Sequence, residues 1–314
     1  MPMKRLYLAL MLALSLSGFP WQRGEQPAHA RGNFSPSTVD TKRNAFVVHN
    51  LIYCQKHPSI EQTMDLYLPA FTKPPLPVVI WVHGGTWMYG DKNLDCLACD
   101  QLLPKFAVAS VNYRLDTESS FPSQIKDLKA AVRFLRAHAK TYKLDPDRIG
   151  VWGESAGAHL AALLGTSGDA AELEGDEGWS KYSSKVQAVC DWSGPTDFNS
   201  AQSQRTPNSK IQFTGQSSPI WVLMGGKMDK KSLAAASPVT YVSKNCPPFL
   251  IMHGDDDDAI PPLQSKELYE ALKTAGCDVQ YIPIKGAGHY LRGPEHDKIA
   301  REFFEIKLGS PKAR

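Results

Sequence analysis

The sequence predicts an α/β fold in which helices cover both faces of a mostly parallel β-sheet. Short apolar runs bounded by turn residues are typical of strands buried on both faces, and here they alternate with segments of helical periodicity. The predicted strands are Met64–Leu68, Val78–His83, Ala107–Tyr113, Ile149–Trp152, Val186–Trp192, Phe249–His253 and Val279–Ile284. The predicted helices are Ile125–Ala137, Ala156–Leu164, Leu263–Ala275 and Asp297–Ile306. In such sheets, ligands bind at the carboxyl ends of the strands.

The composition is that of a globular protein. A chain of 314 residues can form one large α/β domain or two small ones. Hydrophobic residues make up 42% of the chain and charged residues 21%, which does not favour disorder. The formal charge is +3, and residues 1–30 contribute +2 of it through three basic residues and one acidic residue. The remaining +1 gives no reason to expect a nucleic-acid partner, and nothing in the sequence sets the oligomeric state.

The first 30 residues have the pattern of a signal peptide. Lys4 and Arg5 precede the apolar run Leu6–Leu16, which is too short to span a bilayer as a mature helix. Ala28–Ala30 supplies a site of two small residues, so cleavage after Ala30 is expected, with an earlier cut near Ser17 left open. The alternative is a retained membrane anchor. We expect a secreted or periplasmic protein without a stable anchor.

Six cysteines are consistent with an oxidising compartment. They are Cys54, Cys96, Cys99, Cys190, Cys246 and Cys277. Six cysteines allow 15 pairings, and the sequence does not choose among them. Cys96 and Cys99 are close enough to bridge locally, although this spacing also occurs in redox motifs. Cys190 lies in an apolar run and is expected to be a small buried residue.

Ser155 lies in a pattern typical of a nucleophile elbow. Gly153 and Gly157 flank it between an apolar strand and a helix. The chain must turn sharply there, which exposes the serine hydroxyl above the sheet. The amide of Ala156 then lies at a helix N-terminus, where it would stabilise a developing negative charge. A plain tight turn of small residues is the alternative.

Among the histidines, His289 is the best candidate for a general base. It follows the last predicted strand, on a glycine-rich loop at the carboxyl end of that strand. His159 lies one helical turn after Ser155, and its helix carries it away from the exposed hydroxyl. His296 is a nearby second candidate, but it belongs to the approach of the final helix.

The acid that orients the base is expected within Asp255–Asp258, which directly follows a predicted strand. Four successive carboxylates also suggest a calcium or magnesium site. Consecutive side chains point in different directions, however, and no regularly spaced second set of ligands lies nearby. We therefore expect one orienting acid in a partly solvated loop and no metal. The order Ser, Asp, His is that of α/β-hydrolases.

A glycine-rich loop supplies candidate oxyanion-hole donors. His83–Trp87 directly follows a predicted strand, and Gly84 and Gly85 let backbone amides approach a substrate oxygen. With Thr86 and the amide of Ala156, these residues form the expected oxyanion hole.

Together these residues resemble the α/β-hydrolase superfamily, specifically exported esterases and lipases similar to hormone-sensitive lipase and to bacterial feruloyl-esterase-like (BD-FAE-type) domains. The resemblance runs from about Met64 to Phe304. Its motifs are Met64–Pro69, His83–Trp87, Val111–Leu115, Asp145–Ile149, Gly153–Gly157 and Ser193–Asp197. It implies an eight-stranded, mostly parallel sheet within a catalytic domain of residues 45–310, preceded by a flexible segment, residues 31–44.

The resemblance also implies roles for single residues. The family acid in His-Gly-x-x-Asp corresponds to Asp257, and the family base in Gly-His corresponds to His289. Thr86 replaces the third glycine that the family loop often has, and Asp258 replaces the proline that often follows the acid.

The implied function is carboxylic-ester hydrolysis, of the carboxylesterase, acetyl-esterase or feruloyl-esterase kind. Ser155, His289 and Asp257 would act through an acyl-enzyme, with no cofactor. Substrates range from small esters and lipids to acetylated or feruloylated polysaccharides. The alternatives are amide, peptide or formamide hydrolysis by the same triad, and a non-catalytic binding module.

A polar insertion, residues 191–243, is expected to form part of a lid or the wall that faces the substrate. Trp87, Trp192 and Trp221 would line an acyl pocket there or pack in the core.

Overall fold

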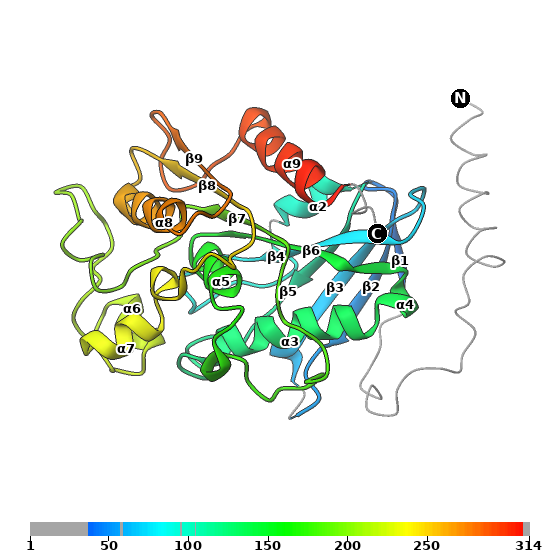
Figure 1. The fold of residues 1–314 in the computed structure, drawn as a ribbon, viewed down its shortest axis with the longest axis horizontal. Coiled ribbons are helices and arrows are strands. Elements are labelled where there is room, and N and C mark those ends of the chain that lie inside the picture. Colours follow the sequence, from blue (N-terminus) through cyan, green and yellow to red (C-terminus); the bar gives the residue numbers. More distant parts are fainter. Residues whose placement is uncertain (1–36, 57–58, 95, 104, 310–314) are drawn as a thin grey trace. The chain divides into compact units, whose positions relative to one another are not determined.

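A single β-sheet organises the computed structural model, which describes residues 37–56, 59–94, 96–103 and 105–309 (Figure 1). The predicted signal peptide, residues 1–30, lies outside the described residues. The described strands are β1 Thr38–Asp40, β2 Ala45–Ile52, β3 Thr63–Pro69, β4 Leu76–Val82, β5 Ala107–Val111, β6 Leu144–Glu154, β7 Ala188–Trp192, β8 Phe249–Gly254 and β9 Val279–Ile284. They pair in the order β1-β2-β3-β5-β4-β6-β7-β8-β9.

The sheet has nine described strands, so the expectation of eight was wrong. The pairs from β5 and β4 through to β9 are all parallel, whereas β1, β2 and β3 join the sheet through antiparallel pairs. The seven apolar runs match β3 to β9, while β1 and β2 were not recognised. Part of the segment expected to be flexible forms β1, whose three residues pair with the start of β2 at the exposed edge. So short an edge strand has little hydrophobic periodicity.

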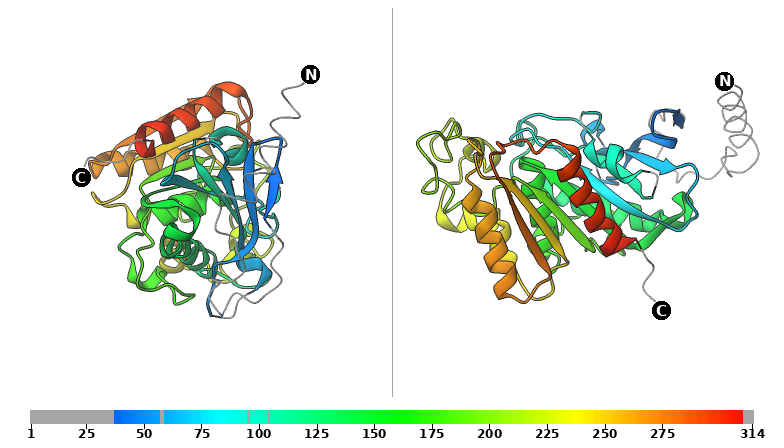
Figure 2. Two further views of the ribbon diagram at one scale, coloured as in Figure 1. Left: turned by 90° about the vertical axis from the view of Figure 1, so that its right-hand side faces the viewer. Right: turned by 90° about the horizontal axis from the view of Figure 1, so that it is seen from above.

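Helices cover both faces of this sheet, as the apolar strands predict. The helices are α2 Leu97–Leu102, α3 Ser123–Ala137, α4 Ala139–Tyr142, α5 Ala156–Thr166, α6 Pro219–Leu223, α7 Lys230–Ala235, α8 Pro262–Thr274 and α9 Pro294–Leu308. Three short 3-10 turns are η1 Ile60–Gln62, η2 Ala171–Leu173 and η3 Pro238–Tyr241. Side chains of α3, α5 and α8 pack in one core cluster, and those of α2 and α9 in another. Figure 2 shows α9, in red, across the sheet from the green helices.

The alternation of side chains along β6 explains why there are two cores. Val151 points into the cluster on the α5 side, and its neighbour Trp152 into the cluster on the α9 side. There Trp152 packs edge-on against Trp81 and Trp192, at ring-centroid distances of 5.6 and 4.8 Å. Trp192 is therefore a core residue and not part of a substrate pocket. Cys190 is fully buried in the same cluster, as expected.

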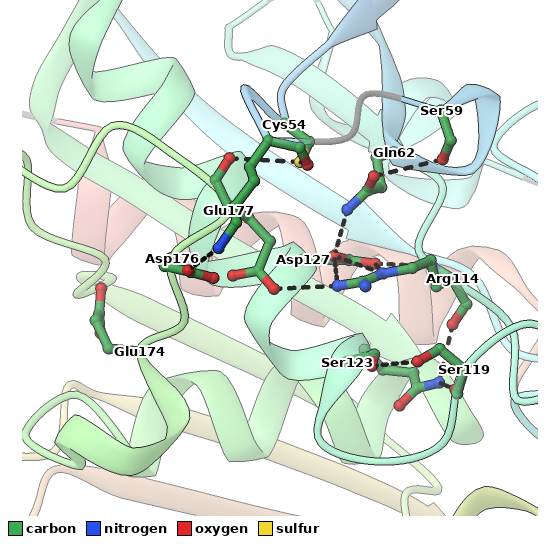
Figure 3. Close-up of polar contacts among 12 residues, drawn as sticks. Cys54, Ser59, Gln62, Arg114, Ser119, Ser123, Asp127, Glu174, Asp176 and Glu177 are labelled. Atoms are coloured by element: carbon green, nitrogen blue, oxygen red, sulfur yellow. Dashed lines mark hydrogen bonds and ion pairs between the residues drawn. The ribbon is translucent and has the colours of Figure 1, made fainter.

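A buried charge network holds the turn between β5 and α3 (Figure 3). The Arg114 guanidinium donates to both carboxylate oxygens of Asp127, at 2.6 and 2.9 Å, and to Glu177 at 3.1 Å. The amide of Gln62 also donates to Asp127, at 2.8 Å. Two residues beyond Arg114, the backbone N–H of Asp116 donates to the carbonyl of Trp87. The network thus positions a segment that supports the predicted oxyanion loop.

The cysteines are bonded in one pair among the described residues. Cys96 and Cys99 form a disulfide at the start of α2, which is the local bridge that their spacing allows. The remaining four cysteines carry free thiols.

Candidate active site

The backbone around Ser155 makes a sharp strand-to-helix turn, as the glycine pattern predicts. Strand β6 ends at Glu154 and α5 begins at Ala156, which leaves Ser155 between them at φ 57° and ψ −121°. A Cβ on Gly153 would lie 2.2 Å from the carbonyl oxygen of Gly157, and one on Gly157 would lie 2.1 Å from the carbonyl oxygen of Val82. Both flanking positions therefore need glycine, and the turn stores backbone strain at the serine.

The structure brings Ser155, His289 and Asp257 together from three strand ends. The Ser155 hydroxyl lies 2.8 Å from His289 Nε2, within hydrogen-bond distance. His289 Nδ1 lies 2.8 Å from Asp257 Oδ2. A neutral imidazole that donates from Nδ1 to the carboxylate keeps Nε2 free to accept the hydroxyl proton.

Burial distinguishes Asp257 from its three neighbours. Asp255 and Asp256 are exposed, and Asp258 pairs with Lys210, whereas Asp257 is 5% exposed. Its Oδ1 accepts the backbone N–H groups of residues 259 and 260, at 2.8 and 2.9 Å.

The charge of Asp257 is stabilised from two sides. Burial alone would raise the pKa of this carboxyl. Hydrogen bonds from His253 and His289, together with their charges, outweigh burial and hold the pKa well below its ordinary value. His253 is itself fully buried, with Nε2 3.0 Å from Asp257 Oδ2 and Nδ1 2.7 Å from the hydroxyl of Ser265. Asp257 is thus an ionised, rigidly held acceptor for His289.

The other histidine candidates lie elsewhere. His159 is fully buried in α5, where Nε2 donates to the carbonyl of Ala236 at 2.7 Å and Nδ1 accepts from the Trp87 indole at 3.2 Å. Burial lowers the pKa of His159 to about 4, so this ring is neutral and structural. His296 belongs to α9, and its buried Nδ1 has no hydrogen-bond partner among the described residues.

The glycine-rich loop lies directly beside the serine. A Cβ on Gly84 would be 3.3 Å from the Cβ of Ser155, and Gly85 and Thr86 both have positive φ values, 111° and 51°. Among the described residues, none accepts a hydrogen bond from the backbone N–H of Gly85, Thr86 or Ala156. The Thr86 hydroxyl donates to the carbonyl of Gly85 at 2.8 Å. The three amides are therefore free to bind an oxyanion beside Ser155.

Sequence reasoning missed an ion pair that ties the base to the nucleophile. Arg292 donates to both carboxylate oxygens of Glu154, the residue before Ser155, and its guanidinium also lies 5.5 Å from the ring centroid of Tyr290. This pair links the His289 loop to the elbow. The two residues are 138 positions apart in the sequence. Glu154 occupies the first variable position of the Gly-x-Ser-x-Gly pattern, so no local sequence signal predicts its pairing with Arg292.

The support from His253 was also missed, although a signal was present. It is the histidine of the His-Gly-x-x-Asp motif, four residues before Asp257.

Within the described parts of the chain, no group of three or more His, Cys, Asp or Glu side chains is placed to hold a metal ion. No described helix is both long and apolar enough to cross a bilayer.

The hollows of the surface differ in size and place. One, with a volume of about 1030 Å³, lies near the amino ends of β6, β7 and β8, where Pro75, Lys185 and Pro248 line it. A much smaller one adjoins Ser155 and is lined partly by the insertion between β7 and β8. We assign the site to the small hollow, because Ser155, whose hydroxyl lies 2.8 Å from His289 Nε2, lines it together with Thr86 and Ala156.

The BD-FAE family model matches residues 64–272. The chain is 31% identical over 217 residues to esterase LipQ of Mycobacterium tuberculosis, covering 68% of this chain and 50% of that protein. It is 31% identical over 262 residues to the probable isoprenylcysteine alpha-carbonyl methylesterase ICMEL1 of Arabidopsis thaliana, covering 77% and 52%. The chain thus spans about half the length of these curated relatives.

Two solved structures share the fold. One is a truncated form of a carbohydrate esterase from gut microbiota, with a TM-score of 0.76 and 28% identity over 86% of this chain and 99% of that chain. The other is a bifunctional GH43-CE protein of Bacteroides eggerthii, with a TM-score of 0.74 and 33% identity over 84% and 35%. The family match over two thirds of the chain, the strand order and the serine elbow agree: the protein belongs to the BD-FAE family and has the α/β-hydrolase fold.

Proposed function

We propose that the protein is a serine hydrolase of carboxylic esters. The observation that carries the proposal is the hydrogen-bonded chain from the Ser155 hydroxyl through His289 to the buried Asp257 carboxylate. A serine hydroxyl becomes a useful nucleophile when an oriented base takes its proton, and this chain supplies both the base and its orientation. The relatives named as esterases support the same reading.

The mechanism has two steps. His289 Nε2 takes the proton of Ser155 as its Oγ bonds to the ester carbonyl carbon, and Asp257 stabilises the resulting imidazolium. His289 then gives this proton to the alcohol oxygen as the bond between that oxygen and the acyl carbon breaks, which leaves an acyl-serine. Water attacks the acyl carbon with His289 as base, and the acid leaves as Ser155 regains its proton.

Negative charge on the carbonyl oxygen is stabilised by the amides of Gly85, Thr86 and Ala156, with Gly84 allowing the close approach. Each such donor contributes about 3 kcal/mol of transition-state stabilisation in comparable acyl transfers. The N-terminus of α5 adds its partial positive charge at the same point. The mechanism uses no metal and no cofactor.

We propose esters of carbohydrate alcohols as the substrate class. The carbohydrate-esterase structure and the GH43-CE protein support this choice. Tyr89 and Tyr290 are 63% and 66% exposed. The backbone N–H of Tyr89 donates to the carbonyl of Gly85 in the oxyanion loop, and Tyr290 is next to His289 in the sequence. Exposed aromatic rings with a polar tip suit the faces and hydroxyls of sugars. Secretion or export to the periplasm after cleavage at Ala30 would give access to such polymers.

The test is Ser155→Ala with p-nitrophenyl acetate as substrate. We expect kcat/KM to fall by about four orders of magnitude or more, because the nucleophile is absent while the fold is kept. A fluorophosphonate probe should label the wild type at Ser155 and leave the variant unlabelled. Ser203→Ala, which changes an exposed serine of the insertion, is the control and should keep both activity and labelling.

Three outcomes would contradict the proposal. Persistent hydrolysis in Ser155→Ala would exclude this serine as the nucleophile. A wild type that hydrolyses p-nitroanilides or formamides but not esters would favour amide chemistry by the same triad. A wild type that neither hydrolyses nor takes up the probe would be a binding module.

A further inference from the structure

The hollow beside Ser155 is small and apolar. Thr86 and Ala156, two of the proposed oxyanion donors, line it together with Ser155. Its remaining walls come mostly from the insertion and carry no charged side chain. They are Trp87, Pro195, Ile211, Phe213, Pro219, Ile220 and Ile260.

The position of His289 decides which half of the ester this hollow receives. In the proposed mechanism the alcohol oxygen must lie near His289 Nε2 to receive its proton. No residue of the His289 loop lines the hollow, whereas the oxyanion donors Thr86 and Ala156 and the nucleophile Ser155 do. The carbonyl carbon therefore lies between the two, with the alcohol on the His289 side and the acyl chain in the hollow.

The hollow has room for only a very small group. Its volume is about 10 Å³, which is about the space of one water molecule. Phe213, Ile220 and Trp87 are 3%, 1% and 3% exposed, so these walls are packed from behind as well. Trp87 is further fixed by its hydrogen bond to His159 and by an edge-on contact with Phe198 at 5.7 Å between ring centroids. A longer acyl chain would have to displace packed side chains.

We infer that the hollow is an acyl site selective for acetyl groups, an inference that rests on the proposed ester hydrolysis. It admits the methyl group of an acetyl ester and excludes butyryl, longer and feruloyl groups. Phe213 and Ile220 are the residues that set this limit. The alcohol half remains unenclosed beside the exposed Tyr290 ring, so selectivity lies in the acyl half.

The test is the chain-length profile of the wild type on p-nitrophenyl acetate, butyrate, octanoate and ferulate. All four share one alcohol, so differences in kcat/KM come from the acyl group. We expect butyrate to fall about tenfold or more below acetate, and octanoate and ferulate about 100-fold or more. Ser155-dependent hydrolysis with a flat profile, or with a longer or feruloyl ester preferred, would overturn the acetyl site alone. Absence of Ser155-dependent hydrolysis of every ester would overturn the proposed function and the acetyl site together.

Two variants identify the limiting residues. Phe213→Ala and Ile220→Ala enlarge the hollow, and each should raise the butyrate-to-acetate ratio of kcat/KM by about tenfold. The matched control is Leu223→Ala. Leu223 is as buried as Ile220 and lies on the same helix, α6, but it does not line the hollow. Its ratio should equal that of the wild type. An equal rise in Leu223→Ala would mean that loosening of the insertion, and not the hollow itself, sets the profile, which would overturn the assignment. The wild-type profile tests the inference even where a variant fails to fold.

Discussion

The two regions that build the site are held in place by different means. Ser155, Asp257 and His289 follow the parallel strands β6, β8 and β9. Strands β6 and β8 lie within the sheet and are mostly buried, whereas β9 is its partly exposed edge strand. The insertion between β7 and β8 supplies most of the wall beside them, and it contains only α6, α7 and η3 as regular structure. Helices of five and six residues are not stable by themselves, so packing against the rest of the molecule must hold them.

The difference separates chemistry from selectivity. The reacting atoms need fixed geometry, and strand ends and paired charges provide it. The wall of the acyl site needs only shape, which an irregular segment can vary without disturbing the strands. A small number of contacts join the two regions. The hydrogen bonds from His159 to the carbonyl of Ala236 and from the backbone N–H and hydroxyl of Thr196 to Gln264 are buried.

The largest expected effect comes from a glycine of the strand-end region. Gly157→Ala places a methyl group 2.1 Å from the carbonyl oxygen of Val82, which is backbone and cannot move aside as a side chain can. We expect the free energy of unfolding to fall by more than about 3 kcal/mol. Esterase activity should also fall, because the elbow and the oxyanion loop must separate. Urea unfolding and p-nitrophenyl acetate hydrolysis measure the two effects.

A glycine of the insertion provides the comparison. Gly215 also lacks a Cβ, but nothing lies within 4 Å of the position where one would be, and only its φ of +87° disfavours alanine. Gly215→Ala should therefore cost about 1 kcal/mol and leave activity near that of the wild type. If Gly157→Ala and Gly215→Ala lower the free energy of unfolding by equal amounts, the strand-end region and the insertion do not differ in how tightly they are packed.

The contact between the regions should make the protein sensitive to acid. Burial lowers the pKa of His159 to about 4, from 6.5 when unfolded. Between these values the unfolded state binds more protons, so stability falls as the pH is lowered from 7 to 5. The expected loss is about 2 kcal/mol.

His159→Gln tests the origin of this loss. The variant should be less stable than the wild type at pH 7, by about 1–3 kcal/mol, because hydrogen-bond partners lose their geometry. Between pH 7 and pH 5, however, the free energy of unfolding of the variant should fall by less than that of the wild type, because the variant has no histidine at position 159 to bind a proton on unfolding. Denaturant unfolding at both pH values provides the measurement, and equal pH slopes for wild type and variant would assign the acid sensitivity to other groups.

Much of the strand-end region could be predicted from the sequence, because its signals are local. The glycines around Ser155 mark a backbone turn, and the apolar runs mark β3 to β9. Asp257 could not be separated from its three neighbours by residue type, since burial and the contact from His253 depend on tertiary packing. For these residues the family resemblance was needed to choose one of four.

The sequence predicted where the insertion lies but not its structure. Its composition marked a polar excursion late in the chain, and the structure places part of it beside Ser155. Ile211 and Phe213 lie in a stretch without helix or strand, so no periodicity identifies them as wall residues. The roles of the three tryptophans also depended on packing: Trp87 lines the hollow, Trp192 lies in the core, and Trp221 is half-buried on α6.

The last expected effect lies where the two regions meet. Asp191, near the end of β7, is fully buried; its Oδ1 accepts the backbone N–H of Gly194 at 3.0 Å, and its Oδ2 has no partner among the described residues. Burial raises its pKa to about 7, above the unfolded value of 3.8. The folded state therefore binds more protons between pH 4 and pH 7, and the stability contributed by this group falls as the pH rises through that range. Asp191→Asn keeps an acceptor for Gly194 without the charge, so it should raise the free energy of unfolding by about 2–3 kcal/mol more at pH 8 than at pH 5. Denaturant unfolding of both proteins at the two pH values gives the comparison, and a gain of equal size at both would show that the buried charge is not what limits stability at this junction.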